Sequence, residues 1–181
     1  MIFIQTLSNE LKKYILEFWK QVKNLFNVYS DKQLISLFKW LNYFIEKLNY
    51  EHSYEPGKLP SFKRGDIVWV NLGHNIGSKL RGRRPVVILE AENNKKDKNI
   101  VIAPIRSYNS KGPKKIFEGL VYVGKHEILT KHSYVDLKHI RSISKMRIYR
   151  QNNKIIQGKL PNEILDEIDQ KLIKLFTKIN T

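Results

Sequence analysis

The sequence of 181 residues contains no cysteine, which excludes a disulfide scaffold, a thiolate zinc site and a cysteine nucleophile. It contains no run close to the ~18 consecutive apolar residues that a membrane span needs. The opening residues Met1 to Ile4 are too few and too uncharged for a signal peptide. No H-E-x-x-H spacing occurs either, so a metal site is not expected. These absences predict a soluble, cytoplasmic protein with no membrane partner, metal or cofactor.

Arginine is absent from residues 1–60, and acidic residues are scarce in the rest of the chain. Residues 1–60 hold 8 lysines against 6 acidic residues, whereas residues 61–181 hold 25 basic residues against 11 acidic ones. The formal net charge of +16 therefore resides mostly in the second part. Abundant lysine is also typical of a plain solvated face, but compositional bias does not gather all the arginines. A region this basic attracts a polyanion by counterion release, which favours nucleic acid as the partner.

Residues 8–27 and 30–48 carry apolar side chains at three- and four-residue steps, a spacing that predicts two amphipathic helices. Ser8 is a suitable N-cap for the first helix, and Ser30 followed by Gln33 is typical of a capping box for the second. Two helices joined this closely make a hairpin, but a lone pair cannot bury both apolar faces well. We therefore expect the hairpin to dock on the rest of the chain, on a second copy or on another protein.

Proline and glycine in residues 50–62 mark a boundary, after which the pattern becomes that of strands. Short apolar segments then follow one another too closely for helices between them, which favours a small antiparallel barrel. The segments expected as strands are 66–71, 85–89, 99–105, 119–123, 134–137, 140–143 and 154–157. Pro161 opens a last amphipathic helix. The sequence thus predicts an α+β chain, with a helical hairpin in residues 1–55 and a barrel domain in residues 62–181.

Four segments of the barrel domain resemble, in the right order, the MazF/PemK family of toxin–antitoxin endoribonucleases. They are FKRGDIVWVNLG at 62–73, NIGSKLRGRRPVVI at 75–88, VIAPI at 101–105 and VDLKHIRSISK at 135–145. The resemblance implies an SH3-like barrel with a C-terminal helix, a homodimer, metal-independent cleavage of single-stranded RNA, and inhibition by a cognate antitoxin protein. The hairpin has no counterpart in the short members, and we expect it to lengthen the dimer contact or to receive the antitoxin.

Cleavage of RNA without a metal needs a base for the ribose 2′-hydroxyl, an acid for the leaving 5′-oxygen and donors for the charge on the phosphorane. Arg84 matches the family's catalytic arginine, and a guanidinium forks onto two phosphate oxygens. In the glycine-containing loop before it, Lys79, Arg81 and Arg83 are expected to hold further phosphates. This cluster is the predicted centre of the RNA site.

Histidine and aromatic side chains offer proton transfer and base stacking. His74 lies in the same loop, which should face RNA, and is the best acid–base candidate among the histidines. Tyr108 follows a predicted strand in a polar loop and is the best candidate for stacking on an unpaired base. Trp69 and Tyr122 lie within predicted strands, so we expect them in the core.

Several positions depart from the family pattern. Arg106 stands where the catalytic threonine is expected, Ser107 follows it, and Lys79 replaces the usual glutamate. Arg106 then acts as a second phosphate clamp, whereas Ser107 supplies the hydroxyl if the alignment slips by one position. The departures keep a second hypothesis open: a non-catalytic module that binds nucleic acid or protein on the same barrel, including a toxin directed at gyrase.

Overall fold

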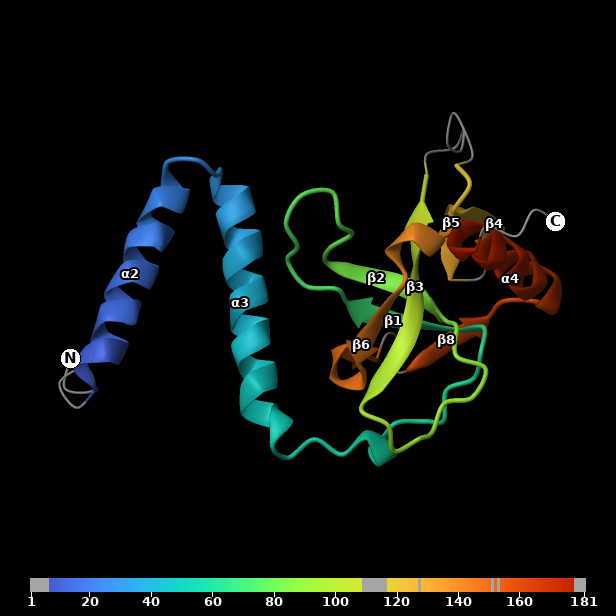
Figure 1. Cartoon of the computed structure of the whole chain (residues 1–181), viewed down its shortest axis with the longest axis horizontal. Coiled ribbons are helices and arrows are strands. Elements are labelled where there is room, and N and C mark those ends of the chain that lie inside the picture. The colour runs from blue at the N-terminus through green and yellow to red at the C-terminus, as the bar shows by residue number, and fades with distance from the viewer. Residues whose placement is uncertain (1–6, 109–116, 127, 151, 153, 178–181) are drawn as a thin grey trace. The chain divides into compact units, whose positions relative to one another are not determined.

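The computed structural model describes residues 7–108, 117–126, 128–150, 152 and 154–177 (Figure 1). The chain forms two compact units, Met1–Asn49 and Tyr50–Thr181. The first unit holds α2 (Asn9–Phe26) and nearly all of α3 (Asp31–Glu51), and the second holds the strands and the C-terminal helix. Within the described residues, no helix combines the length and the apolar character that crossing a membrane requires.

The N-terminal hairpin is capped as its sequence predicts. The hydroxyl oxygen of Ser8 accepts a hydrogen bond from the backbone N–H of Leu11 at 3.2 Å, which satisfies one of the free donors at the start of α2. At the start of α3, Oε1 of Gln33 accepts from the backbone N–H of Ser30 at 2.9 Å, which is one half of a capping box. The predicted helical hairpin is therefore confirmed.

The second unit is built on an eight-stranded antiparallel sheet. Its main path has the order β4-β5-β3-β2-β1-β7, while β6 pairs with β3 and β8 pairs with β1. The path runs from β4 to β7 without closing on itself, so the sheet curls like a barrel that stays open. The strands are β1 Asp66–Asn71, β2 Arg83–Ile88, β3 Asn99–Ser107, β4 Leu120–His126, β5 Leu129–Asp136, β6 Arg141–Ser144, β7 Ile148–Tyr149 and β8 Ile156–Lys159. The short 3₁₀ turn η1 (Pro56–Lys58) precedes β1, while η2 (Leu137–His139) connects β5 to β6 and η3 (Lys145–Arg147) connects β6 to β7. The helix α4 (Asn162–Phe176) follows β8.

The predicted fold class is confirmed, but several strands are longer than their sequences suggest, and β5 is extended the most. β5 begins at Leu129, five residues before the predicted start at Tyr134. The reason is that residues 130–133 are polar or charged and give no apolar signal. Pairing with β4 extends the strand instead, through partners such as Gly124 with Ser133. Tertiary pairing thus decides the length of β5, and this added part carries residues of the candidate site.

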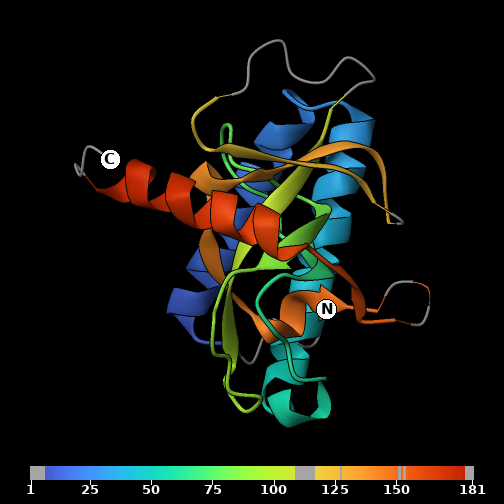
Figure 2. The ribbon, with the colours of Figure 1, turned by 90° about the vertical axis from the view of Figure 1, so that its right-hand side faces the viewer.

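Alternation along β1, β2 and β3 divides the core into two clusters on opposite faces of the sheet. One face packs against α4, whose Leu165 and Ile168 are buried there (Figure 2). Its buried members are Ile67, Val87, Leu89, Ala103, Ile105, Val121, Leu129, Val135, Leu137, Leu160, Leu165 and Ile168. The other face encloses Phe62, Val68, Val70, Leu72, Leu80, Val86, Ile88, Ile100, Ile102, Ile143 and Ile148.

The turn before β1 anchors the C-terminal helix. Gly65 has a φ of +87°, and its carbonyl oxygen accepts from the N–H of Leu160 at 2.9 Å. A Cβ atom on Gly65 would lie 3.0 Å from Cδ1 of Leu165, so a side chain does not fit without movement. Beside it, Arg64 forms an ion pair with Asp169 of α4. These contacts hold α4 against the sheet.

Lys145 is a charged side chain buried at the start of η3, with 1% of its surface exposed. Its Nζ donates to the carbonyl oxygen of Asn94 at 2.9 Å. Burial lowers the pKa of Lys145, and the nearby carboxylates of Asp97 and Glu90 offset part of that effect. The lysine therefore pins the β2–β3 connection to η3 at an electrostatic cost.

Candidate functional site

The β1–β2 loop presents cations from a braced backbone. The N–H of Leu72 donates to the carbonyl of Gly82, and the N–H of Gly82 donates to the carbonyl of Gly73, both at 2.9 Å. Inside the loop, Nδ2 of Asn75 donates to the carbonyls of Leu72 and Leu80, and Leu80 is buried in the core. The loop is therefore held at its base and its middle, and its polar side chains project from a fixed backbone.

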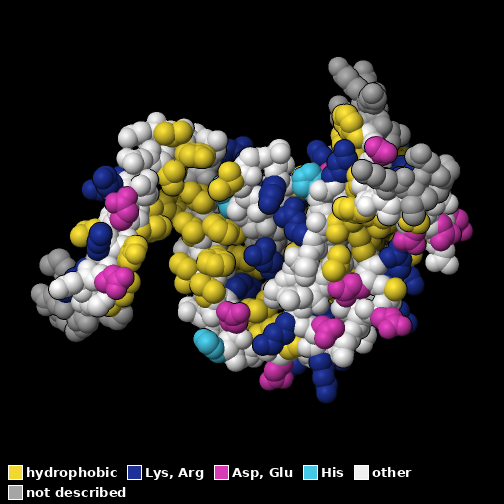
Figure 3. Space-filling view, viewed as in Figure 1, with side chains coloured by type: hydrophobic (Ala, Val, Ile, Leu, Met, Phe, Trp, Pro, Cys, Tyr) yellow, Lys and Arg dark blue, Asp and Glu magenta, His cyan; other side chains and the backbone are white. Residues whose placement is uncertain are grey.

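The predicted phosphate-holding residues occupy different surroundings. Lys79 and Arg81 are exposed on the loop, and His74 is half-buried within it. Arg83, at the start of β2, places its Cζ 4.0 Å from the centre of the Tyr149 ring on β7. That distance is typical of a cation–π contact, so Arg83 is turned toward β7. Figure 3 shows lysine and arginine side chains gathered on this unit.

Arg84 is half-buried beside the loop and is held by one end of its guanidinium. Its Nε–H donates to the carbonyl oxygen of Arg81 at 3.0 Å. Among the residues that the structure describes, its two terminal nitrogens have no hydrogen-bond partner. Burial lowers the pKa of Arg84, and repulsion by Arg106 lowers it further. The Arg84 side chain is thus a cation held in place at Nε, with terminal N–H donors that no described residue uses, next to the second cation Arg106.

Arg106 is the second cation, and a buried carboxylate balances it. Its Nη1 lies 2.9 Å from Oδ2 of Asp136, whose side chain is only 4% exposed. Nδ1 of His139 lies 3.0 Å from the same oxygen without meeting it at hydrogen-bonding angles. Two neighbouring guanidinium groups are therefore balanced by one carboxylate, which pairs with Arg106, so the cluster of Arg84, Arg106 and Asp136 keeps an excess positive charge. Such a cluster attracts an anion.

A strip of aromatic rings continues from Arg106 across β5 and β4. Cζ of Arg106 lies 5.6 Å from the ring centre of Tyr108, and the rings of Tyr108 and Tyr134 meet edge to face at 5.0 Å. Tyr122 lies 5.0 Å from Tyr134 and stacks on His132 at 5.9 Å. The hydroxyl of Tyr122 is 2.6 Å from Nδ1 of His132. We define these four residues, Tyr108, Tyr122, His132 and Tyr134, as the aromatic strip.

The aromatic strip corrects one expectation from the sequence. Tyr122 was expected in the core because it lies in a strand, but this expectation is wrong: the residue is 40% exposed. Its strand partner Tyr134, by contrast, is buried. β4 lies at one end of the sheet path, so Tyr122 has a neighbouring strand on one side only, whereas Tyr134 on β5 lies between β4 and β3. An exposed tyrosine at the end of a row of rings that begins beside Arg106 is a surface suited to unpaired bases.

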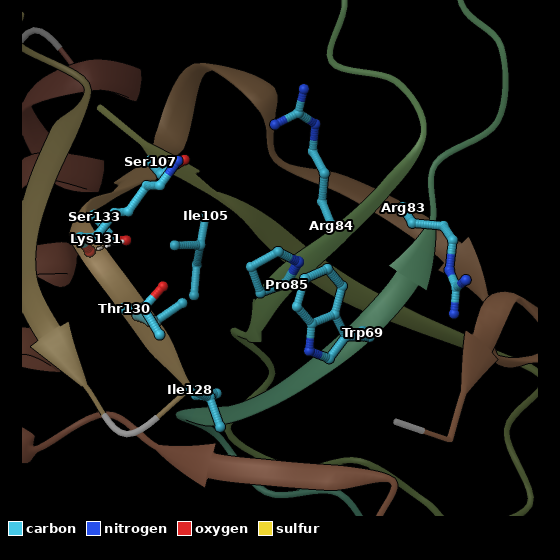
Figure 4. A pocket seen from close by; sticks show the side chains of 11 residues that line it. Trp69, Arg83, Arg84, Pro85, Ile105, Ser107, Ile128, Thr130, Lys131 and Ser133 are labelled. Carbon is cyan, nitrogen blue, oxygen red and sulfur yellow. Dashed lines mark hydrogen bonds between the residues drawn. The ribbon is translucent and has the colours of Figure 1, made fainter. Parts of the chain in front are cut away.

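On the face of β3 opposite to Arg106, a cavity of about 260 Å³ opens between the sheet and the β4–β5 hairpin (Figure 4). Its wall includes the cross-strand pair Trp69 and Pro85, and Ser107 and Arg84 lie at its edge. The lining residues are Trp69, Arg83, Arg84, Pro85, Ile105, Ser107, Ile128, Leu129, Thr130, Lys131 and Ser133. The cavity combines an apolar wall with hydroxyl and cationic groups.

The structure therefore separates some of the predicted site residues and joins others. Arg106 and Ser107 are neighbours in β3, so their side chains point to opposite faces of the sheet. Arg84 contacts both sides, because it lines the cavity and lies within electrostatic reach of Arg106. The sequence did not indicate that Asp136 would meet Arg106 or that His132 would meet Tyr122. The only signal for Asp136 was a carboxylate in an otherwise apolar strand end, and its partner lies 30 residues away.

The described residues contain no group of three or more histidine, aspartate or glutamate side chains that could hold a metal ion. The face that carries Arg84 offers guanidinium, carboxylate, imidazole and phenol groups. Together they provide donors for an anion, an acid–base group and surfaces for stacking.

Comparisons with known proteins find one family model and several solved structures that are similar to the chain. The family model described as the PemK-like, MazF-like toxin of type II toxin–antitoxin systems matches residues 63–176. The crystal structure of MazF (Form-I) from Deinococcus radiodurans is 23% identical, with a TM-score of 0.49 over 65% of this chain and 97% of its own. An endoribonuclease in complex with its cognate antitoxin, from a mycobacterial species, is 16% identical, with a TM-score of 0.50 over 67% of this chain and 100% of its own. No curated protein matched the sequence.

Proposed function

The chain belongs to the PemK-like, MazF-like toxin family of type II toxin–antitoxin systems, and on this premise we propose that it cleaves single-stranded RNA without a metal ion. Endoribonuclease activity is general for this family. The residues that would perform the reaction in this chain differ from the family pattern. The groups present in this site therefore have to account for the reaction.

The observation that carries the proposal is the excess charge at Arg84. Its terminal nitrogens have no hydrogen-bond partner within the described part of the chain, whereas the neighbouring Arg106 is already paired with the buried carboxylate of Asp136. A phosphate would accept two hydrogen bonds from the guanidinium fork and would relieve the repulsion between the two arginines. A transition state with more charge on the phosphoryl oxygens would gain more from this arrangement than the substrate does.

The reaction that fits is attack by the ribose 2′-oxygen on the adjacent phosphorus. A bond forms between O2′ and phosphorus, the bond from phosphorus to O5′ breaks, and the products are a 2′,3′-cyclic phosphate and a 5′-hydroxyl. A base takes the proton from O2′, and an acid delivers a proton to O5′. The nucleophile is part of the substrate, so its correct placement supplies much of the rate enhancement.

For the proton transfers we assign the imidazole of His132 and the hydroxyl of Tyr122. The hydroxyl oxygen of the exposed Tyr122 lies 2.6 Å from Nδ1 of His132, and both side chains lie on the face of the sheet that carries Arg106. Asp136 is less suited because its carboxylate is buried and engaged by Arg106. Ser107 remains the candidate from the cavity side, and His74 the candidate from the loop. The rings of the aromatic strip would stack on the bases that flank the cleaved phosphate.

The same basic face suits an inhibitor. One of the similar structures is titled as an endoribonuclease in complex with its cognate antitoxin. We propose that this chain also binds a cognate antitoxin, and that an acidic segment of that protein covers Arg84 and the β1–β2 loop. We also propose that the chain forms the homodimer that the sequence predicts. Cytoplasmic location follows from the proposed substrate, which is a transcript.

The test is incubation of the purified full-length chain with a long single-stranded RNA in the presence of EDTA. We expect cleavage that leaves a cyclic phosphate, and no cleavage of DNA of the same sequence, because DNA lacks the attacking hydroxyl. His132→Gln should slow cleavage strongly, whereas the exposed His52→Gln should not. Binding of the RNA without any cleavage would reject the enzyme in favour of a non-catalytic module, for which the arginine at position 106 is the favouring feature.

A further inference from the structure

The N-terminal hairpin carries a large apolar surface that its own two helices do not cover. The helices contact each other near their connection, where the rings of Phe26 and Phe38 lie 6.3 Å apart. Val22 is the only buried side chain among the residues of α2, and Leu34 the only one in α3. The rest of both apolar stripes is exposed, as the hydrophobic side chains gathered along these helices in Figure 3 illustrate.

The exposed residues follow the helical period, so they form stripes and are not scattered over the surface. On α2, Leu11, Tyr14 and Phe18 are between 45% and 65% exposed and recur at steps of three and four. On α3, Phe44, Ile45 and Leu48 are between 40% and 53% exposed on the matching side. The charged residues of α2, among them Lys13, Glu17 and Lys20, lie elsewhere on the helix.

The size of this surface is that of a stable protein interface. A fully covered aromatic side chain buries roughly 150–250 Å². The half-exposed rings and aliphatic side chains of the two stripes, with Trp19 at 55%, therefore offer on the order of 700–800 Å². A standard interface buries about 800 Å² on each partner. Isolated surface hydrophobic residues need no partner, but a surface of this area does.

We propose that this surface is covered by the hairpin of a second copy of the chain, so that two hairpins form a four-helix bundle. The stripes hold only apolar and tyrosine side chains, so they require a long apolar helical partner rather than a charged one, and a second copy supplies that surface. Charge does not oppose the contact: residues 1–49 hold 7 lysines and 4 acidic residues, a small share of the net charge of +16. In a two-fold arrangement, the ring-rich stripe of α2 faces the more aliphatic end of α3.

This assembly does not depend on the proposed nuclease activity. It places two basic barrel domains on one bundle, which would allow one transcript to contact both units. Effective concentration then strengthens RNA binding without any change in the site itself. The prediction concerns the hairpin alone and can be tested on protein that is catalytically inactive.

The chain has no cysteine, so a single Lys20→Cys substitution gives one attachment point for a nitroxide on the polar side of α2. In the full-length protein, a distance between two labels then arises only from two copies. Helices in a bundle lie 8–10 Å apart, so pulsed dipolar spectroscopy should give a narrow distribution centred at about 20–40 Å. Phe18→Glu should abolish it and weaken self-association at least tenfold in sedimentation equilibrium, and Lys13→Glu should change neither.

Ile45→Glu on α3 provides an independent variant of the same surface, and circular dichroism shows whether each variant keeps its helices. A narrow distance that survives both Phe18→Glu and Ile45→Glu would overturn the proposal, because a dimer held by the barrels alone gives that result. Absence of such a distance in the labelled Lys20→Cys chain without any further substitution would overturn the proposal as well, whether the stripes are covered by the chain's own barrel domain, by a different protein or by anionic lipid vesicles.

Discussion

Replacing Arg84 by alanine tests the centre of the proposed site. The substitution removes the guanidinium whose terminal nitrogens are unpartnered within the described residues, and it leaves Arg106 paired with Asp136. Loss of one preorganised donor to a developing oxyanion costs about 3 kcal/mol of transition-state stabilisation. At about 1.4 kcal/mol for each factor of ten, the cleavage rate should fall by roughly two orders of magnitude.

Stability should change little, because two effects of the Arg84→Ala substitution oppose each other. The variant loses the hydrogen bond from Nε to the carbonyl of Arg81, but it also loses the burial of a cation and its repulsion by Arg106. Arg84→Lys should fall between wild type and alanine, since an ammonium keeps the charge but cannot fork onto two oxygens. A loss of rate with intact folding would thus assign the guanidinium itself.

The assay is single-turnover cleavage of a labelled single-stranded RNA in EDTA, with the enzyme in excess. Lys98→Ala is the matched control, because it removes one exposed positive charge at the opposite end of β3 from Arg106. The control should cleave within about threefold of wild type, since a single remote charge contributes mainly to nonspecific attraction. If Arg84→Ala cleaves as fast as Lys98→Ala, the reasoning about the unpartnered guanidinium is refuted.

Three further predictions concern the loop, the helix anchor and the buried lysine. RNA anisotropy titrations of the Lys79→Ala, Arg81→Ala double variant should give a shallower slope of log affinity against log salt concentration, by about 0.7 for each phosphate that is no longer neutralised. A lower affinity with an unchanged slope would argue against phosphate binding by these two side chains. Gly65→Ala should cost at least ~1–2 kcal/mol in urea unfolding, because its φ is +87° and a neighbour occupies the space, whereas Gly57→Ala should be nearly neutral. Burial lowers the pKa of Lys145, so between that lowered pKa and 10.5 the unfolded chain binds more protons than the folded chain. The free energy of unfolding should therefore rise with pH in this window. Lys145→Met should remove this part of the pH dependence, and an equal pH dependence in the variant and the wild type would contradict the assignment.

Local features of this protein followed from neighbouring residues, and the sequence was sufficient for them. The helix starts at Ser8 and Ser30 depend on hydrogen bonds that reach only three residues along the chain. The short apolar segments, such as 67–70, and the close spacing between them favoured an antiparallel sheet. Arg84 could be singled out because the segment 75–88 around it resembles the family's pattern, in which the catalytic arginine follows a glycine-containing loop and precedes proline.

The partners of the site residues depended on strand register, which only the tertiary structure decided. Arg106 meets Asp136 because β3 pairs with β5, and a shift by one residue would turn Arg106 to the face now occupied by Ser107. His132 meets Tyr122 only because β5 begins earlier than its apolar pattern indicates. Strand pairing and packing determine which side chains from distant segments of the chain come into contact. The sequence therefore predicts which chemical groups are present but not which of them are in contact.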